Sequence, residues 1–165
     1  MTKLDRLDYR ILEVLQGNGR IPVKRLAEMV GISVSPCWQR IKTLEKTGII
    51  RRYTAEIAIE KLQSVQIVLA QIILEKHTRE AYQVFARGVL DIPEVIECYE
   101  VTGSFDYHVK FLITGINHYN EVLERFICAT SGVEKYFTYV VTRVTKDEKT
   151  LRLREASFSS FDISK

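Results

Sequence analysis

The spacing of hydrophobic residues changes near residue 50, and this change limits the possible folds of the chain more than any other feature. From Leu4 to Gly48 the apolar residues recur every three or four positions, which is the spacing of amphipathic helices. From Val65 onward, strand-like segments alternate with helical ones, as in an α+β domain. The sequence therefore predicts a helical domain over residues 1–50, a strand or wing and connector over 51–64, an α+β domain over 65–146 and a polar tail over 147–165.

The first of these segments predicts three short helices with a tight turn between the second and the third. Pro22 suits the first turn of a helix, where its missing N–H costs nothing, and Gly31 suits the end of the second helix. Ser33 or Ser35 can cap the third helix. The inward side of that helix is expected to contain Val34, Cys37, Ile41 and Leu44. This plan is a helix-turn-helix, and the alternating residues IIRRYTAEIAI that follow predict a strand or wing.

Positive charge is concentrated on this helical domain. Residues 1–60 carry eleven Lys/Arg against seven Asp/Glu, although the formal net charge of the whole chain is only +3. Between Arg20 and Arg52 there are eight basic residues and two acidic ones, Glu28 and Glu45. Such a local excess is the electrostatic footprint of a nucleic-acid surface.

The outward side of the expected third helix carries the residue types that contact DNA. Hydroxyl, amide and guanidinium groups near a helix N-terminus reach base edges or phosphates when the helix enters a major groove. We expect such contacts from Ser33, Ser35, Pro36, Gln39, Arg40 and Lys42. Flanking phosphate contacts are expected from Arg20, Lys24, Arg25, Arg51 and Arg52. The alternative is a solvated basic face on an ordinary three-helix bundle, and Trp38 is expected to pack at the flank of its helix.

The second half predicts the element order βαββαβ. The strand at 65–74 is apolar on both faces and is followed by a helix at 78–90, with Ala81, Val84, Phe85 and Gly88 on one side. Strands at 95–101 and 105–113 form a hairpin, then come a helix and a last strand at 135–144. This order is that of a ferredoxin-like sandwich, in which both helices cover one face of an antiparallel sheet. Because 65–74 is apolar on both faces, we expect a second subunit to cover the other face.

Several other classes of protein are disfavoured by the sequence. The charged N-terminus MTKLDRLDYR has no apolar region of a secretory signal, and no apolar run approaches the ~20 residues that cross a bilayer. The three cysteines are too far apart for a zinc set or a C-x-x-C pair. We therefore expect a cytoplasmic protein with no membrane partner, no metal site and no cofactor.

Three stretches resemble the Lrp/AsnC family of prokaryotic transcriptional regulators, and the resemblance covers nearly the whole chain. They are "LDRLDYRILEVLQGNGR", "SPCWQRIKTLEKTGIIRRYTA" and "VTGSFDYHVK" followed downstream by "TYVV". The resemblance implies a helix-turn-helix DNA-binding domain and a βαββαβ ligand-sensing domain that forms dimers and often octamers. It also implies an amino-acid effector between protomers, near residues that match here Thr102, Gly103, Ser104, Phe105, Asp106, Tyr107 and Tyr139.

The hairpin has chemistry that suits an amino acid. Gly103 allows close approach of the backbone to a ligand, and Asp106 could accept a hydrogen bond from an α-amino group. Relatives commonly have an apolar residue where His108 stands, so His108 could alter effector choice or make the response pH-dependent. The alternatives are a turn glycine, a turn cap or surface carboxylate, and a partly exposed strand histidine. Tyr139 is equally consistent with a core or interface aromatic.

The leading hypothesis is a sequence-specific transcriptional regulator that binds pseudo-palindromic double-stranded DNA and responds to a small amino acid. It would act as a dimer and as a tetramer of dimers. An enzyme related to siroheme decarboxylases is the alternative, but no nucleophile with a neighbouring base can be identified, and no catalytic residue is assigned. A third hypothesis is a sensing protein that has lost DNA binding, which the basic and hydroxyl groups at 33–42 disfavour.

Overall fold

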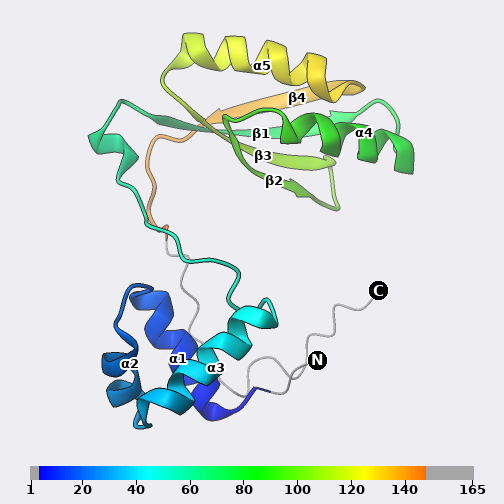
Figure 1. Cartoon of the computed structure of the whole chain (residues 1–165). Helices are drawn as coiled ribbons and strands as arrows, with labels where there is room; N and C mark the ends of the chain where they lie inside the picture. The colour runs from blue at the N-terminus through cyan, green and yellow to red at the C-terminus, as the bar shows by residue number, and fades with distance from the viewer. Residues whose placement is uncertain (1–3, 148–165) are drawn as a thin grey trace. The chain divides into compact units, whose positions relative to one another are not determined.

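The computed structural model describes residues 4–147 of the chain. Within this range the chain divides into two compact units, one reaching Glu56 and the other running from Ile57 to Thr145. The N-terminal unit contains α1 (Arg6–Gly17), α2 (Val23–Val30) and α3 (Val34–Lys46) (Figure 1). The three predicted helices are therefore confirmed, and each unit is described by itself below.

Local signals in the sequence set the ends of these helices. Asp5 caps α1 in a capping box, since its side chain accepts the N–H groups of Leu7 and Asp8 while Asp8 bonds back to the backbone N–H of Asp5. Gly31 ends α2 in the left-handed region, with φ of 83°. Ser33 occupies the N-cap position of α3, but its side chain makes no capping hydrogen bond. A serine therefore stands at the expected N-cap position of α3, but its side chain does not cap the helix.

The core of the N-terminal unit is formed by one stripe from each helix. It consists of Ile11, Leu26, Ala27, Val30, Cys37, Ile41 and Leu44. The prediction for α3 holds for three of its four inward residues, because Val34 is 46% exposed. Val34 is the first residue of the helix, and the buried side of α3 starts only at Cys37.

The connector is not a strand, contrary to the prediction from its alternating residues. Residues 51–58 are irregular and exposed, and a single turn of 3-10 helix, η1 (Ile59–Lys61), follows them. Strand backbone is stable only when its N–H and C=O groups find a neighbouring strand. No described strand of this chain pairs with that segment, so alternation of residue types alone does not make it β-structure.

The C-terminal unit is an α+β sandwich with the predicted order of elements. It contains β1 (Gln66–Leu74), α4 (Arg79–Leu90), β2 (Val95–Glu100), β3 (Tyr107–Ile113), α5 (Ile116–Thr130) and β4 (Val133–Val140). The sheet has the order β2-β3-β1-β4 and every neighbouring pair is antiparallel. The ferredoxin-like prediction is therefore confirmed, with β3 starting two residues later and β4 starting and ending earlier than expected.

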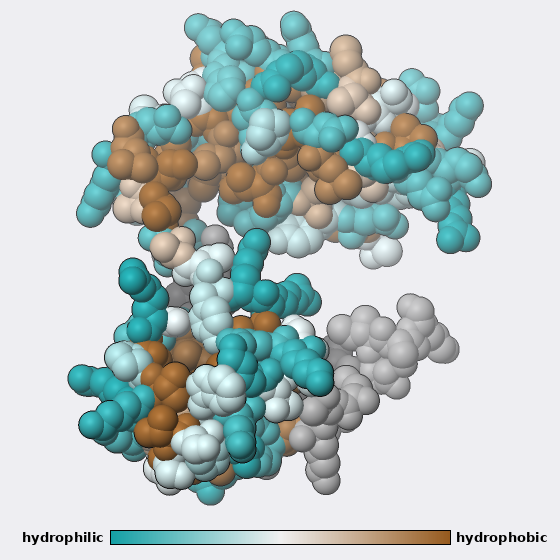
Figure 2. Space-filling view, in the orientation of Figure 1, coloured by the Kyte–Doolittle hydropathy of each residue, from teal (hydrophilic) through white to brown (hydrophobic). Residues whose placement is uncertain are grey.

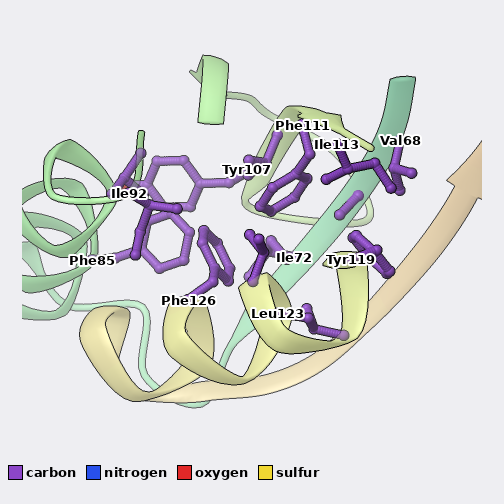
Figure 3. Close-up of a cluster of buried hydrophobic side chains, with 14 of the residues drawn as sticks. Val68, Ile72, Phe85, Ile92, Tyr107, Phe111, Ile113, Tyr119, Leu123 and Phe126 are labelled. Atoms are coloured by element: carbon purple, nitrogen blue, oxygen red, sulfur yellow. The ribbon is translucent and has the colours of Figure 1, made fainter. Parts of the chain in front are cut away.

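Helices α4 and α5 lie on the same face of the sheet and enclose an aromatic core (Figures 1 and 3). Phe85 of α4 stacks on Tyr107 of β3 at 4.1 Å between ring centroids, and Phe126 of α5 meets Phe85 edge-on at 5.7 Å. Val84, which was expected on the inner side of α4, is 39% exposed. The inner side of that helix instead continues through Val89.

The two helices approach each other closely at Gly88. A Cβ atom at this position would lie 2.3 Å from the carbonyl oxygen of Ala129 and 2.8 Å from Cα of Thr130. Both are backbone atoms of α5, which cannot move as a flexible side chain can. Gly88 is therefore required for the packing of α4 on α5.

The other face of the sheet, which we call the open face, is not covered by any described helix. In β1 the even positions from Val68 to Leu74 are buried under the helices, while the odd positions are only half-buried. The strand registers extend this face across the sheet. The open face consists of Ile67, Leu69, Gln71, Ile73, Glu97, Tyr99, His108, Lys110, Leu112, Lys135, Phe137 and Tyr139.

Candidate DNA-binding surface and effector site

The exposed side of α3 presents the polar residues that the sequence assigns to DNA. Five of the six residues expected to contact DNA from this region are exposed, namely Ser33, Ser35, Pro36, Gln39 and Lys42. The five residues expected to contact phosphate are exposed as well, namely Arg20, Lys24, Arg25, Arg51 and Arg52. The N-terminal unit thus keeps its basic groups in solvent, where they are available to an anionic partner.

Arg40 differs from these residues because its guanidinium already has partners in the chain. Its Nη1 lies 2.7 Å from Oδ2 of Asp5 and 2.7 Å from Oδ1 of Asp8. The backbone N–H of Asp8 and the Arg40 guanidinium lower the pKa of the Asp5 carboxyl. Arg40 therefore ties α3 to the capping box of α1, and it orients the helix whether or not it also touches DNA.

Lys42 and Trp38 form a second local arrangement on α3. The Lys42 ammonium lies 2.8 Å from Oε2 of Glu45 and 5.7 Å from the centroid of the Trp38 ring. Lys42, followed by the hydroxyl of Tyr53, lowers the pKa of Glu45. Trp38 itself is 51% exposed, so it is less buried than the flank position expected for it.

The hairpin between β2 and β3 is open to solvent at its turn. Thr102, Gly103 and Ser104 are exposed, and a Cβ atom on Gly103 would meet no atom within 4 Å. Gly103 has φ of 138°, a conformation that other residues rarely adopt. Glu100, Val101 and Thr102 line a shallow surface pocket beside this turn. The turn therefore offers open backbone next to a carboxylate.

Asp106 is not a surface carboxylate of the hairpin. Its side chain is buried, with Oδ2 accepting the N–H of Leu74 at 2.8 Å and Oδ1 accepting the hydroxyl of Tyr82. Nε2 of His77 lies 3.2 Å from Oδ2. Burial alone would raise the pKa of Asp106, but the Leu74 N–H and the Tyr82 hydroxyl outweigh it and lower the pKa. The same contact raises the pKa of Tyr82 to about 12.

The expectation that Asp106 accepts an α-amino group is not supported by these contacts. Asp106 lies before β3 and its side chain is buried. Its oxygens are already used by three groups of the protein, which leaves little acceptor capacity for a ligand amine. The sequence showed no signal for this role, since the partners lie 24 to 32 residues away along the chain.

The remaining predicted effector residues separate into two groups. Tyr107 belongs to the core, where its ring stacks on Phe85 and its hydroxyl reaches Oε2 of Glu100 at 3.3 Å. His108 and Tyr139 lie on the open face, on either side of Gln71, whose Oε1 accepts the Tyr139 hydroxyl at 3.2 Å. The Phe105 ring lies 6.3 Å from the His108 ring.

Some residues of the open face were not singled out from the sequence. Glu97 and Lys110 form an ion pair at 3.1 Å, and the ammonium of Lys135 lies 5.0 Å from the centroid of the Phe137 ring. Gln71 is paired with His108 and Phe137 in the strand register, and it accepts the hydroxyl of Tyr139. Only pairing between strands brings these side chains together, so their positions along the chain gave no sign of the arrangement.

Residues 4–147 hold no group of three or more His, Cys, Asp or Glu residues that could bind a metal ion. No helix in the same range is long and apolar enough to span a membrane. Figure 2 shows hydrophilic residues over the outer surface of α4 and α5, with a hydrophobic band where these helices meet the sheet.

Comparison with known proteins identifies both units. Residues 4–51 match a winged helix-turn-helix DNA-binding family model, and residues 67–151 match that of the Lrp/AsnC ligand binding domain. The chain is 42% identical over 162 residues to the transcriptional regulatory protein DoeX of Halomonas elongata, covering 98% of this chain and 99% of the relative. It is 33% identical over 151 residues to the leucine-responsive regulatory protein of Escherichia coli, covering 92% of each.

Solved structures give the same result. A transcriptional regulator of Neisseria meningitidis in complex with L-Met is 32% identical, with a TM-score of 0.83, over 90% of this chain and 96% of that one. These relatives are regulators of transcription and not enzymes. With a helix-turn-helix followed by a ligand-binding α+β domain, and relatives that match it almost end to end, the chain belongs to the Lrp/AsnC family of DNA-binding transcriptional regulators.

Proposed function

We propose that this regulator reads pseudo-palindromic operators through the exposed side of α3 and that an amino acid bound between protomers changes its assembly or its DNA affinity. The observation that carries the proposal is the exposed set of hydroxyl, amide and basic groups on and around α3. Basic groups neutralise phosphate and release counterions, which gives affinity that falls with salt. Residues near the start of α3 supply base contacts. This activity on chromosomal DNA takes place in the cytoplasm.

The open face supports pairing of two chains through their sheets. It carries four half-buried aliphatic residues, Ile67, Leu69, Ile73 and Leu112, together with the exposed rings of Tyr99, Phe137 and Tyr139. An apolar surface of this kind commonly marks an interface. A dimer built through this face carries two helix-turn-helix units, which suits half-sites about one helical turn apart. Dimers then associate further into a tetramer of dimers.

The effector site is proposed at the β2–β3 turn, next to a partner protomer. Exposed backbone at Gly103 suits an α-carboxylate, and Glu100 beside it is the better acceptor for an α-amino group because Asp106 is already engaged. The effector side chain would contact His108 and Tyr139 on the open face, together with Phe105, whose ring lies near the His108 ring. The complex of the Neisseria relative with L-Met supports an amino acid as the ligand class.

The proposed function is tested by fluorescence anisotropy with a duplex from the promoter of its own gene and an unrelated duplex of equal length. We expect tighter binding to the promoter, a steep loss with salt, and a shift in affinity with one or a few of the twenty amino acids. Equal, weak binding to both duplexes, and to any site selected from random sequence, would contradict the proposal.

Effector choice is tested separately with His108→Leu. This change is expected to alter which amino acid shifts the binding curve, or the pH dependence of that shift, while DNA affinity without effector stays the same. Arg87→Leu, a change at an exposed residue of α4, serves as the control. An unchanged amino-acid profile and pH profile in His108→Leu would show that His108 is an ordinary strand residue.

A further inference from the structure

Two apolar side chains on the first half of α3 remain exposed in the folded chain. Val34 is 46% exposed and Trp38 is 51% exposed. They stand four positions apart, so they are neighbours on one side of the helix. We call them the apolar strip of α3.

The N-terminal core does not need the strip. Its packing on α3 runs through Cys37, Ile41 and Leu44, all of which are nearly fully buried. The Lys42 ammonium lies over the Trp38 ring, which favours a defined ring position at the helix surface. Two exposed apolar side chains beside a basic one suit a surface that contacts a partner, and the Lys42 ammonium favours an anionic one.

The surroundings of the strip fit the major groove of DNA as that partner. Ser35 and Gln39 follow Val34 and Trp38 directly on the same helix and are exposed beside them. In the major groove one apolar group is available to side chains, the 5-methyl group of thymine. Polar residues next to an apolar strip can thus read base edges while the strip contacts thymine methyl groups.

We propose that Val34 and Trp38 contact thymine 5-methyl groups and make the regulator prefer thymine at defined positions of its half-site. The inference rests on the proposed DNA-binding function and adds the base that these two residues select. Each methyl group contacted is expected to contribute about fourfold in affinity, which corresponds to the ~0.8 kcal/mol of one buried methyl group.

The test uses the full chain and a duplex selected by it from random sequence. Each thymine is replaced in turn by deoxyuridine, which pairs identically but lacks the methyl group. For the wild type, we expect about a fourfold loss at one or two positions in each half-site. For Trp38→Gln, or Val34→Ser as a second variant, the loss should disappear at the thymine that the replaced residue contacts.

Met29→Ala is the matched control variant. Met29 is an exposed apolar residue on a different helix, since it is 52% exposed on α2 and lines a surface pocket with residues of α1. It should show the full wild-type loss with deoxyuridine. Far-UV circular dichroism and thermal unfolding show whether each variant is folded, and Val34→Ser provides the comparison if Trp38→Gln is not.

The outcomes separate the two proposals. If the wild type selects no duplex, the DNA-binding function itself fails. If it selects one but deoxyuridine has no effect, or has an equal effect in wild type and both variants, only the thymine contact is overturned. A change in the mass of the assembly in Trp38→Gln, with the deoxyuridine loss intact, would identify the strip as an interface between chains and also overturn it.

Discussion

At the scale of single residues, two groups that the sequence associates with ligands are engaged inside the chain. Arg40 joins α3 to the capping box of α1 through Asp5 and Asp8. Asp106 accepts hydrogen bonds from Leu74 and Tyr82, which fixes the start of β3 against β1 and α4. Both residues hold a functional element in place. Substituting either one therefore changes the stability of the protein, whether or not it also changes ligand binding.

Arg40 can be distinguished from a phosphate contact by the salt dependence of DNA binding. Arg40→Gln should lower the stability of the N-terminal unit by less than about 1 kcal/mol, because the ion pair is partly exposed. The slope of log K against log salt should remain that of the wild type. Arg25→Gln, which removes an exposed basic group, should reduce that slope by about 1. Equal slopes for the two variants would contradict these roles.

Asp106 should contribute stability that depends on pH. Its pKa is lowered in the folded chain, so the contribution is present above the unfolded value of about 3.9 and is lost as the pH falls through the folded value. Asp106→Asn leaves one acceptor oxygen for several donors and should cost roughly 1–3 kcal/mol at pH 7. Urea unfolding of both proteins should show a smaller difference near pH 3. A difference that does not change with pH would contradict a charged role.

At the scale of elements, the packing of one helix on another limits the residues allowed at a position more than the hydrophobic pattern of the helix does. Gly88→Ala would place a Cβ atom against the backbone of Ala129 and Thr130, and it should destabilise the C-terminal unit by about 1–3 kcal/mol. Gly17→Ala, at the end of α1, meets no atom within 4 Å and should be neutral or slightly stabilising. Thermal unfolding checks both, and equal melting temperatures would show that α4 and α5 can separate freely at Gly88.

Hydrophobic periodicity was enough to predict the three N-terminal helices and the order βαββαβ, because both depend on which face of an element is buried. It failed at residues 51–58, where alternating residues do not form a strand. It also misplaced Val34 and Asp106, since their surroundings depend on a helix start and on contacts between distant segments. The site was therefore predictable as a region of the chain, while the partners of its charged groups were not.

At the scale of the whole molecule, the proposed function requires two copies of the chain. Leu69 and Lys110 are paired in register on the open face, in the two central strands of the sheet. Leu69→Glu should therefore convert the assembly to monomers and weaken binding to a two-half-site operator. Leu90→Glu is the control, because Leu90 is the last residue of α4 and is 82% exposed. Sedimentation velocity gives the masses, and a dimer that survives Leu69→Glu would place the interface elsewhere.

The most direct test of the central claim, that the exposed side of α3 reads DNA sequence, is the specificity ratio of a double variant. Ser35→Ala combined with Gln39→Ala removes two exposed polar groups without changing the charge. Its affinity for the selected duplex should fall by about 1–3 kcal/mol while its affinity for an unrelated duplex stays unchanged. Lys24→Gln should weaken both duplexes alike. A double variant that keeps the wild-type ratio would show that α3 does not read the sequence.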